Sequence, residues 1–191
     1  MKVEKRDIIL KVAQNLFARY GLKKTTVDEI ARDARVSKGT IYHYFKSKED
    51  IFSAVVERES KILKDKIKEA IEKEDPPQKK LRAFVLTKIH YMRELVNLYN
   101  VTKDIVTEVL PQLETARKSY FDDEMKIVKE ILTEGVEKRI FTIKKIDLTA
   151  LAMISALKGL EYPWVMHGKS IDIEESIDAL LEILFKGIQK K

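Results

Sequence analysis

The sequence predicts an all-α protein with a small N-terminal domain and a larger helical C-terminal domain. Apolar residues recur three and four positions apart through nearly all of the 191 residues, whereas strand-like alternation is not sustained anywhere. The chain is 45% hydrophobic, which is enough to bury a sizeable core. We expect about nine helices, divided between residues 1–47 and residues 48–191.

The first helix carries an apolar stripe and is expected to end at Gly21. Glycine is common just past the last helical residue, because it adopts positive φ without a Cβ clash. This stripe predicts the face that packs against the following helices, and its members are Ile8, Ile9, Val12, Ala13, Leu16, Phe17 and Tyr20.

Residues 25–52 predict two short helices around a three-residue turn, followed at once by a third helix. Thr26 and Glu29 have capping-box spacing at the start of the first, and Ser37 is a favourable N-cap for the second. Ser47 and Asp50 repeat the capping-box pattern where the third begins. Two helices joined in this way form a helix-turn-helix, whose second helix enters the major groove of DNA.

Charge along the chain agrees with binding to nucleic acid. Residues 1–48 hold twelve Lys and Arg against five Asp and Glu, a net charge of +7, whereas the whole chain carries +6. A basic end on a nearly neutral body is the electrostatic pattern of a nucleic-acid-binding protein. Three helix N-termini in one short segment add free N–H groups suited to phosphates.

A denser pattern is spread over residues 5–52. It consists of Ala13, Leu16, Phe17 and Gly21, then Thr25-Thr26-Val27, Ile30-Ala31, Val36-Ser37, Gly39-Thr40-Ile41-Tyr42-His43-Tyr44-Phe45, Lys48-Glu49 and Ile51-Phe52. This stretch resembles the DNA-binding domain of the TetR family of transcriptional regulators. The resemblance covers about a quarter of the chain, and the remainder matches the family only in length and helical character.

The residues that we expect at the DNA follow from this segment. Lys38 leads the second helix and is able to donate to guanine or to a phosphate, while Gly39 lets the backbone approach closely. The resemblance implies that Tyr42 and Lys48 contact phosphates. Ile41 and Phe45 are expected in the core. Tyr44 is alternatively a packing residue, and Thr26 and Ser37 are alternatively helix caps that do not contact DNA. The full set of candidate DNA-binding residues is Thr26, Arg35, Ser37, Lys38, Gly39, Thr40, Tyr42, His43, Tyr44 and Lys48.

Further helices are expected along the C-terminal domain. A long helix after Ser47 should end near Lys73, where Glu74-Asp75-Pro76-Pro77 breaks it. Later helices are expected over about 78–96, 97–110 and 111–138, with a turn over 139–146. Asp147 and Asp172 are candidate caps for the last two helices, and Pro163 should kink or end the first of these.

The last two helices suggest a second copy of the chain as partner. Both carry broad apolar faces, which are able to form a four-helix bundle with their symmetry mates or to pack within one chain. The resemblance implies a homodimer through these helices. A two-fold dimer would bind an inverted-repeat operator in double-stranded DNA.

The resemblance also implies a small-molecule effector bound between helices of the C-terminal domain. Few polar residues are available there, so we expect an apolar or amphipathic ligand; its identity is not encoded in any motif. The candidate lining residues, any of which is alternatively plain core, are Phe84, Lys88, Tyr91, Tyr120, Met153, Leu157, Tyr162 and Trp164.

Patterns for catalysis, cofactors and export are absent from the sequence. It has no cysteine, three histidines without HExxH spacing, and neither a P-loop nor GxGxxG. Paired carboxylates such as Asp122-Asp123-Glu124 are expected on solvated helix faces. No apolar run is long enough to span a membrane, and the N-terminus lacks the apolar region of a signal peptide. We therefore expect a cytoplasmic protein that is not an enzyme and has no metal or cofactor.

These observations favour a sequence-specific transcriptional regulator, most simply a repressor that a ligand releases from its operator. Two alternatives stay open. One is a DNA-binding protein without effector control, and the other is a helical protein that binds a lipid or a partner. The operator, the effector and the regulated genes are beyond what the sequence encodes.

Overall fold

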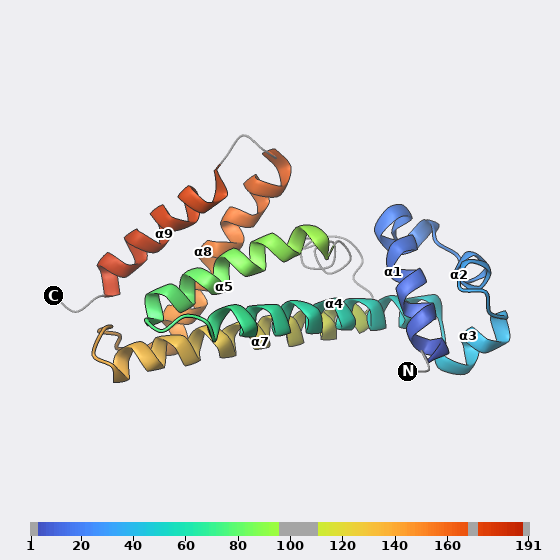
Figure 1. The fold of residues 1–191 in the computed structure, drawn as a ribbon, viewed down its shortest axis with the longest axis horizontal. Coiled ribbons are helices and arrows are strands. Elements are labelled where there is room, and N and C mark those ends of the chain that lie inside the picture. The colour runs from blue at the N-terminus through green and yellow to red at the C-terminus, as the bar shows by residue number, and fades with distance from the viewer. Residues whose placement is uncertain (1–3, 96–110, 168–171, 189–191) are drawn as a thin grey trace. The chain divides into compact units, whose positions relative to one another are not determined.

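Eight α-helices make up the regular structure of the protein across the residues that its computed structural model describes, which are 4–95, 111–167 and 172–188 (Figure 1). The all-α class is therefore confirmed. The helix expected over 97–110 lies outside the described residues. The helices are α1 (Lys5–Lys24), α2 (Val27–Asp33), α3 (Lys38–Tyr44), α4 (Lys48–Ile71), α5 (Pro77–Glu94), α7 (Pro111–Glu137), α8 (Ile146–His167) and α9 (Ile173–Ile188).

The chain forms two compact units. The first comprises Met1–Ile62 and Leu95–Ser119, and the second comprises Leu63–Glu94 and Tyr120–Lys191. Helix α4 contributes residues to both units. The division at residues 47 and 48 that the sequence suggested concerns domains of distinct function, and it stays a prediction.

In the first unit, α1, α2 and α3 pack against one another. Ile9, Ala13 and Phe17 of the predicted stripe are buried, and Leu10 joins them. Ile8 and Tyr20 were wrongly included in the buried stripe, since they are 38% and 47% exposed. Ile8 lies one residue, or about 100° around the helix, from Ile9. Tyr20 lies near the end of the helix, where the Arg19 guanidinium covers its ring at 5.1 Å.

Gly21 kinks α1 near its end, because its φ of 77° interrupts the helical backbone. That positive φ favours glycine because it has no Cβ. The Thr25 hydroxyl donates a hydrogen bond of 2.9 Å to the Gly21 carbonyl, and the Thr25 side chain is fully buried. The expected end at Gly21 is therefore wrong, since Gly21 kinks the helix and helical turns continue to Lys24, with Thr25 as the C-cap.

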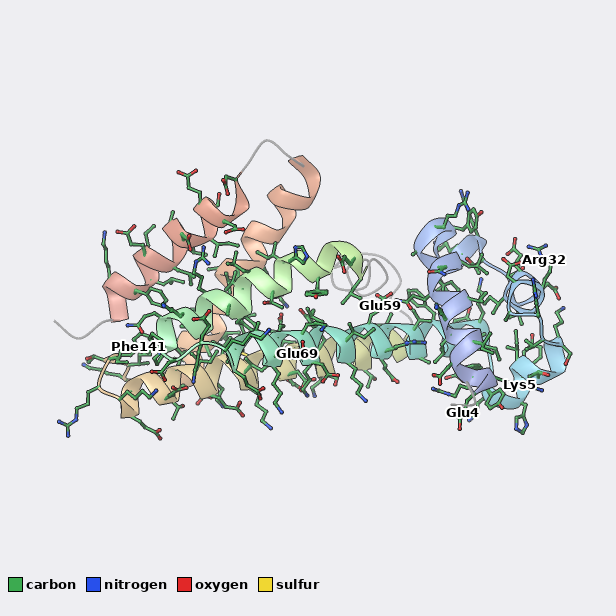
Figure 2. All side chains as sticks on the ribbon, in the orientation of Figure 1. Glu4, Lys5, Arg32, Glu59, Glu69 and Phe141 are labelled. Atoms are coloured by element: carbon green, nitrogen blue, oxygen red, sulfur yellow. The ribbon has the colours of Figure 1, made fainter. Side chains whose placement is uncertain are left out.

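Long-range contacts join α4 to the rest of the first unit. Phe52 of α4 meets Phe17 of α1 edge-on, with ring centroids 5.0 Å apart. Gln14 Nε2 donates to Glu59 Oε1 at 2.9 Å, and Glu59, which Figure 2 labels on α4, is 1% exposed. An apolar contact and a buried polar contact therefore fix α1 against α4 within this unit.

The second unit is held by helix packing and by ion pairs between helices. Helix α5 packs against α9, where Arg82 binds Asp178 through two hydrogen bonds of 2.6 and 2.9 Å. Lys80 of α5 reaches Glu134 of α7 at 2.7 Å, which connects these two helices as well. The expected break between α4 and α5 is confirmed, since α4 ends at Ile71 and α5 begins at Pro77.

A tight turn follows α7. Figure 2 labels Phe141 in this turn, and its ring stacks on Phe185 of α9 with centroids 6.1 Å apart. The ring also fills the space that a Cβ on Gly135 would need, because an ideal Cβ there would overlap Phe141 Cδ2. A glycine in α7 is therefore required by the close approach of an aromatic ring.

The caps of the last two helices were predicted with mixed success. Asp172 caps α9, since its Oδ1 accepts from the backbone N–H groups of Glu174 and Glu175 at 3.0 and 3.1 Å. Asp147 was wrongly predicted as a cap, because α8 begins at Ile146 and places Asp147 inside its first turn. There its negative charge still suits the helix dipole. Helix α8 also continues past Pro163 to His167 rather than ending at the proline.

Candidate functional site

The helix-turn-helix of the first unit is built from three local caps. At the start of α2 the Thr26 hydroxyl accepts from the Glu29 N–H at 3.3 Å, and Glu29 Oε2 accepts from the Thr26 N–H at 2.8 Å. The predicted capping box is thus confirmed. The hydrogen bond from the Thr26 backbone, with that from its hydroxyl, lowers the pKa of Glu29 below its ordinary value.

The turn between α2 and α3 reverses the chain over Ala34–Val36. Arg35 has a positive φ of 54°, and the Val36 N–H donates to the Ala31 carbonyl at 3.0 Å. Ser37 then caps α3, since its hydroxyl accepts from the Thr40 N–H at 3.1 Å. The Arg35 side chain is exposed, as its predicted role at a phosphate requires.

Helix α3 divides its residues between core and solvent. Ile41 is fully buried and Phe45, just past the helix, is 3% exposed, so both core assignments are confirmed. In contrast, Tyr42 is 53% exposed and Tyr44 is 38% exposed, so both rings present part of their surface to solvent. The ring of His43 meets the ring of Tyr44 edge-on with centroids 5.0 Å apart. The remaining candidates on this surface are Ser37, Lys38 and Gly39, which are exposed, and Thr40, which is half-buried.

Lys38, at the start of α3, is already engaged by a residue that the sequence did not suggest. Its Nζ lies 2.7 Å from Asp28 Oδ1, and the two side chains are 52% and 69% exposed. The hydrogen bond that Lys38 donates to Asp28 raises the pKa of Lys38. Asp28 belongs to α2, and its ten-residue separation from Lys38 gives no local signal for the pairing.

The start of α4 carries the last candidate, Lys48. The Asp50 N–H donates to the Ser47 hydroxyl at 3.1 Å, which confirms Ser47 as the N-cap. The reciprocal bond differs from the expected capping box, since Asp50 Oδ2 accepts from the N–H of Lys46 rather than from that of Ser47. Lys48 is half-buried in the first turn of α4, beside this cap.

In the second unit, most of the candidate effector residues are buried. Phe84 and Lys88 of α5 are 0% and 2% exposed, and Met153 and Leu157 of α8 are 2% and 3% exposed. Tyr91 is half-buried. The side chains of Tyr162 and Trp164 lie outside the described residues.

Two of these candidates meet in a charged cluster that includes a residue missed by the sequence. Lys88 Nζ lies 2.5 Å from Glu124 Oε1 and 5.8 Å from the centre of the Tyr120 ring. The Tyr120 hydroxyl donates to the same carboxylate oxygen at 2.6 Å. The expectation that Asp122-Asp123-Glu124 lies on a solvated face is wrong for Glu124, which is 2% exposed. We call Lys88, Tyr120 and Glu124 the buried cluster.

Surface hollows of the second unit lie apart from most of these candidates. One of about 640 Å³ follows α7 from Phe121 to Glu137, and one of about 470 Å³ lies between Lys144 and Leu184. Among the effector candidates whose side chains are described, Met153 alone borders one of them. Both hollows are open surface features, and neither is bordered by Lys88, Tyr120 or Glu124.

Within the described ranges, no group of His, Asp and Glu side chains is arranged to hold a metal ion. None of the helices in that part of the chain combines the length and apolar character needed to cross a bilayer.

Comparison with known proteins identifies the first unit's motif. Residues 9–55 match the family model described as "Bacterial regulatory proteins, tetR family". Over the whole chain, the HTH-type transcriptional regulator YhgD of Bacillus subtilis (strain 168) is 28% identical, with 98% of each chain covered. The fatty acid metabolism regulator protein of the same organism is 26% identical, covering 96% of this chain and 95% of that protein.

Solved structures share the fold from end to end. The fatty acid degradation regulator FadR from Bacillus halodurans superposes with a TM-score of 0.77 at 25% identity, covering 97% of this chain and 96% of that one. The regulator FadR from Bacillus subtilis, solved in complex with stearoyl-CoA, has the same fold, with a TM-score of 0.78 at 24% identity and coverage of 96% and 99%. Residues 9–55 therefore carry the DNA-binding motif of the TetR family of transcriptional regulators, and the described chain has the fold of solved regulators from end to end.

Proposed function

We propose that the protein is a homodimeric repressor that binds an inverted-repeat operator and leaves it when an acyl ligand, such as a long-chain acyl-CoA, binds the second unit. One observation carries the DNA-binding part of this proposal. Helix α3 buries Ile41 completely while its neighbour Tyr42 stays 53% exposed, so one side anchors the helix and the other is free to face DNA. A helix presented in this way is the element that helix-turn-helix proteins insert into the major groove.

Each exposed residue of this surface has a role suited to its chemistry. Lys38 donates to guanine or to a phosphate, and the absence of a side chain at Gly39 permits close approach of the backbone. Tyr42 and Lys48 bind phosphates, which positions the helix without reading sequence. The other members of the surface, which contact phosphates or base edges, are Thr26, Arg35, Ser37, Thr40, His43 and Tyr44.

The apolar residues left exposed on α8 and α9 support a dimer. Leu148 and Leu151 of α8 are 57% and 42% exposed, and Ile183 of α9 is 69% exposed. Their neighbours Ile177 and Leu181 on α9 are buried within the chain, so the two sides of α9 serve different contacts. A second copy packed on the outer side would form a four-helix bundle and present two α3 helices to a symmetric operator.

An acyl effector is favoured by the relatives and by the apolar core. One relative is named a fatty acid metabolism regulator, and one structure of the same fold holds stearoyl-CoA. Phe84, Met153 and Leu157 provide buried apolar surface in the second unit. Such a ligand alters DNA binding only if its affinity differs between the DNA-bound and the released arrangement of the dimer.

Selection of bound duplexes from a random pool tests this function, with the full-length protein as bait. We expect an inverted repeat, and release of that duplex by micromolar dodecanoyl-CoA or stearoyl-CoA in a gel-shift titration. A regulator of this kind acts on DNA in the cytoplasm and catalyses no reaction. Recovery of duplexes that share no repeat would favour the alternative of a DNA-binding protein lacking sequence preference, with its strong salt dependence.

A repeat that is recovered but not released by any acyl compound would leave the DNA-binding function standing and contradict the effector class. Binding of acyl compounds without protection of any duplex would favour the third possibility, a helical lipid-binding or partner-binding protein. Analytical ultracentrifugation of the free protein, at the protein concentration used for the selection, decides whether it is a dimer.

A further inference from the structure

The buried cluster holds a carboxylate oxygen that has no hydrogen-bond partner in the part of the chain that the structure describes. Lys88 and Tyr120 both approach Oε1 of Glu124, at 2.5 and 2.6 Å. The second oxygen, Oε2, is buried and has no hydrogen-bond partner among the described residues. The Glu124 side chain as a whole is 2% exposed, so bulk solvent does not replace the missing donor.

Leaving such an oxygen unsatisfied destabilises the folded protein, because an ionised carboxylate loses its hydration on burial. Most buried polar atoms in folded proteins find a partner, and an exception calls for an explanation such as a ligand, a water molecule or a functional role. The location favours a ligand, since Phe84 lies one helical turn from Lys88 on α5 and is fully buried. An apolar chain and a polar end would thus be accommodated by neighbouring positions of one helix.

Charge decides which polar groups are accepted there. Glu124 Oε2 is a hydrogen-bond acceptor without a donor among the described residues. A ligand carboxylate beside it would bring a second acceptor and a second negative charge to the same buried position, which the low dielectric of the interior strongly disfavours. A neutral group with an N–H or O–H would satisfy Oε2 without adding charge.

We propose that Lys88, Tyr120 and Glu124 form the polar end of the effector site, and that Glu124 Oε2 accepts a hydrogen bond from an uncharged N–H or O–H joined to an apolar chain. This inference rests on the proposed effector control and narrows its ligand class. It favours acyl conjugates that carry amide N–H groups, as the pantetheine arm of an acyl-CoA does, over free fatty acids.

A series of ligands with one chain and different ends tests the proposal. The probes are dodecanamide, methyl dodecanoate, dodecanoate and dodecanoyl-CoA, titrated into the full-length protein by calorimetry and into its selected operator complex by gel shift. We expect dodecanamide and dodecanoyl-CoA to bind wild type about tenfold or more tightly than methyl dodecanoate, which offers no donor. Dodecanoate should bind no better than the ester.

Glu124→Gln should change this order. The substitution removes the negative charge beside the polar end of the ligand, so dodecanoate should gain about tenfold or more relative to dodecanamide. Asp122→Asn is the matched control, because it makes the same charge change on an exposed residue of α7. The control should keep the wild-type order. If Glu124→Gln does not fold, the wild-type series still decides the donor requirement.

Several outcomes would overturn the proposal. Equal affinity of wild type for dodecanamide and dodecanoate would overturn it. An unchanged order of ligand affinities in a folded Glu124→Gln protein would overturn it as well. In either case the cluster has only a structural role. Binding of dodecanoyl-CoA without dodecanamide would place recognition at the nucleotide end instead. In these three cases acyl control itself survives, whereas failure of every probe to bind would reject the proposed effector class together with this inference.

Discussion

Two neighbouring residues of α3 should respond to truncation in opposite ways. Ile41→Ala removes three carbon groups from a fully buried side chain. At roughly 0.8 kcal/mol for each group, the transfer contribution is about 2.4 kcal/mol, and the cavity left behind raises the cost within the range of about 2–5 kcal/mol. Tyr42→Ala trims a side chain that is 53% exposed, and it should change the free energy of unfolding by no more than about 0.5 kcal/mol.

Thermal unfolding followed by circular dichroism measures the difference. A destabilisation of about 1 kcal/mol lowers the Tm of a chain of this size by about 2–4 °C, so Ile41→Ala should lower it by at least about 5 °C and Tyr42→Ala by less than about 2 °C. Operator affinity, measured well below both transitions, should instead fall mainly for Tyr42→Ala. A large drop in the stability of Tyr42→Ala, or full operator affinity in that variant, would refute the division of α3 into an anchoring side and a DNA-facing side.

Three further predictions concern charge and packing. Lys48→Ala should reduce the slope of log affinity against log salt by about 0.9 for each phosphate that the lysine neutralises, or about 1.8 for a dimer, in a titration of mixed-sequence duplex; an unchanged slope would contradict the assignment of Lys48 to a phosphate. Gly135→Ala should destabilise the protein by about 1–3 kcal/mol in urea unfolding, because its Cβ would overlap the ring of Phe141, and the cost should shrink when Phe141→Leu is added. Hydrogen bonds from Lys138 first, and from Lys80, hold the pKa of Glu134 below its ordinary value of 4.5, so its contribution to stability is complete above that pH and is lost as the pH falls through the lower, folded-state pKa. Glu134→Gln should flatten this part of the acid dependence, and identical curves for variant and wild type would show that the pair adds nothing.

Local signals explain how much of the first unit could be predicted. A capping box depends on side chains three residues apart, so Thr26 with Glu29 and the cap at Ser37 followed directly from sequence spacing. The burial of Ile41 followed in the same way from helical periodicity and the family pattern. Periodicity was less reliable at the ends of α1, where Tyr20 continues the apolar stripe beyond the region that the neighbouring helices cover.

Contacts between distant helices could not be predicted. Glu124 follows two other acidic residues, and such a run usually marks a solvated surface, yet Lys88 and Tyr120 bind it in the core. The sequence places Lys88 and Glu124 on separate helices and gives no indication of their register. The pairing of Asp28 with Lys38 across the turn could not be predicted for the same reason. Each candidate site therefore includes a carboxylate, Asp28 or Glu124, whose contact is known only from the three-dimensional structure.

The contact between Lys38 and Asp28 makes base recognition an exchange of partners. An ammonium that is already bonded at 2.7 Å gains little net free energy by moving to a guanine, unless the abandoned carboxylate also finds a donor. A G·C pair offers an acceptor for the ammonium and a donor for the carboxylate, because guanine presents O6 and N7 as acceptors while cytosine presents its N4 amino group. An A·T pair carries its amino donor on the purine and a carbonyl acceptor on the pyrimidine, the reverse of G·C, so the ammonium and the carboxylate would each face a mismatched group. Discrimination at this step of the operator should therefore exceed what a solitary lysine provides.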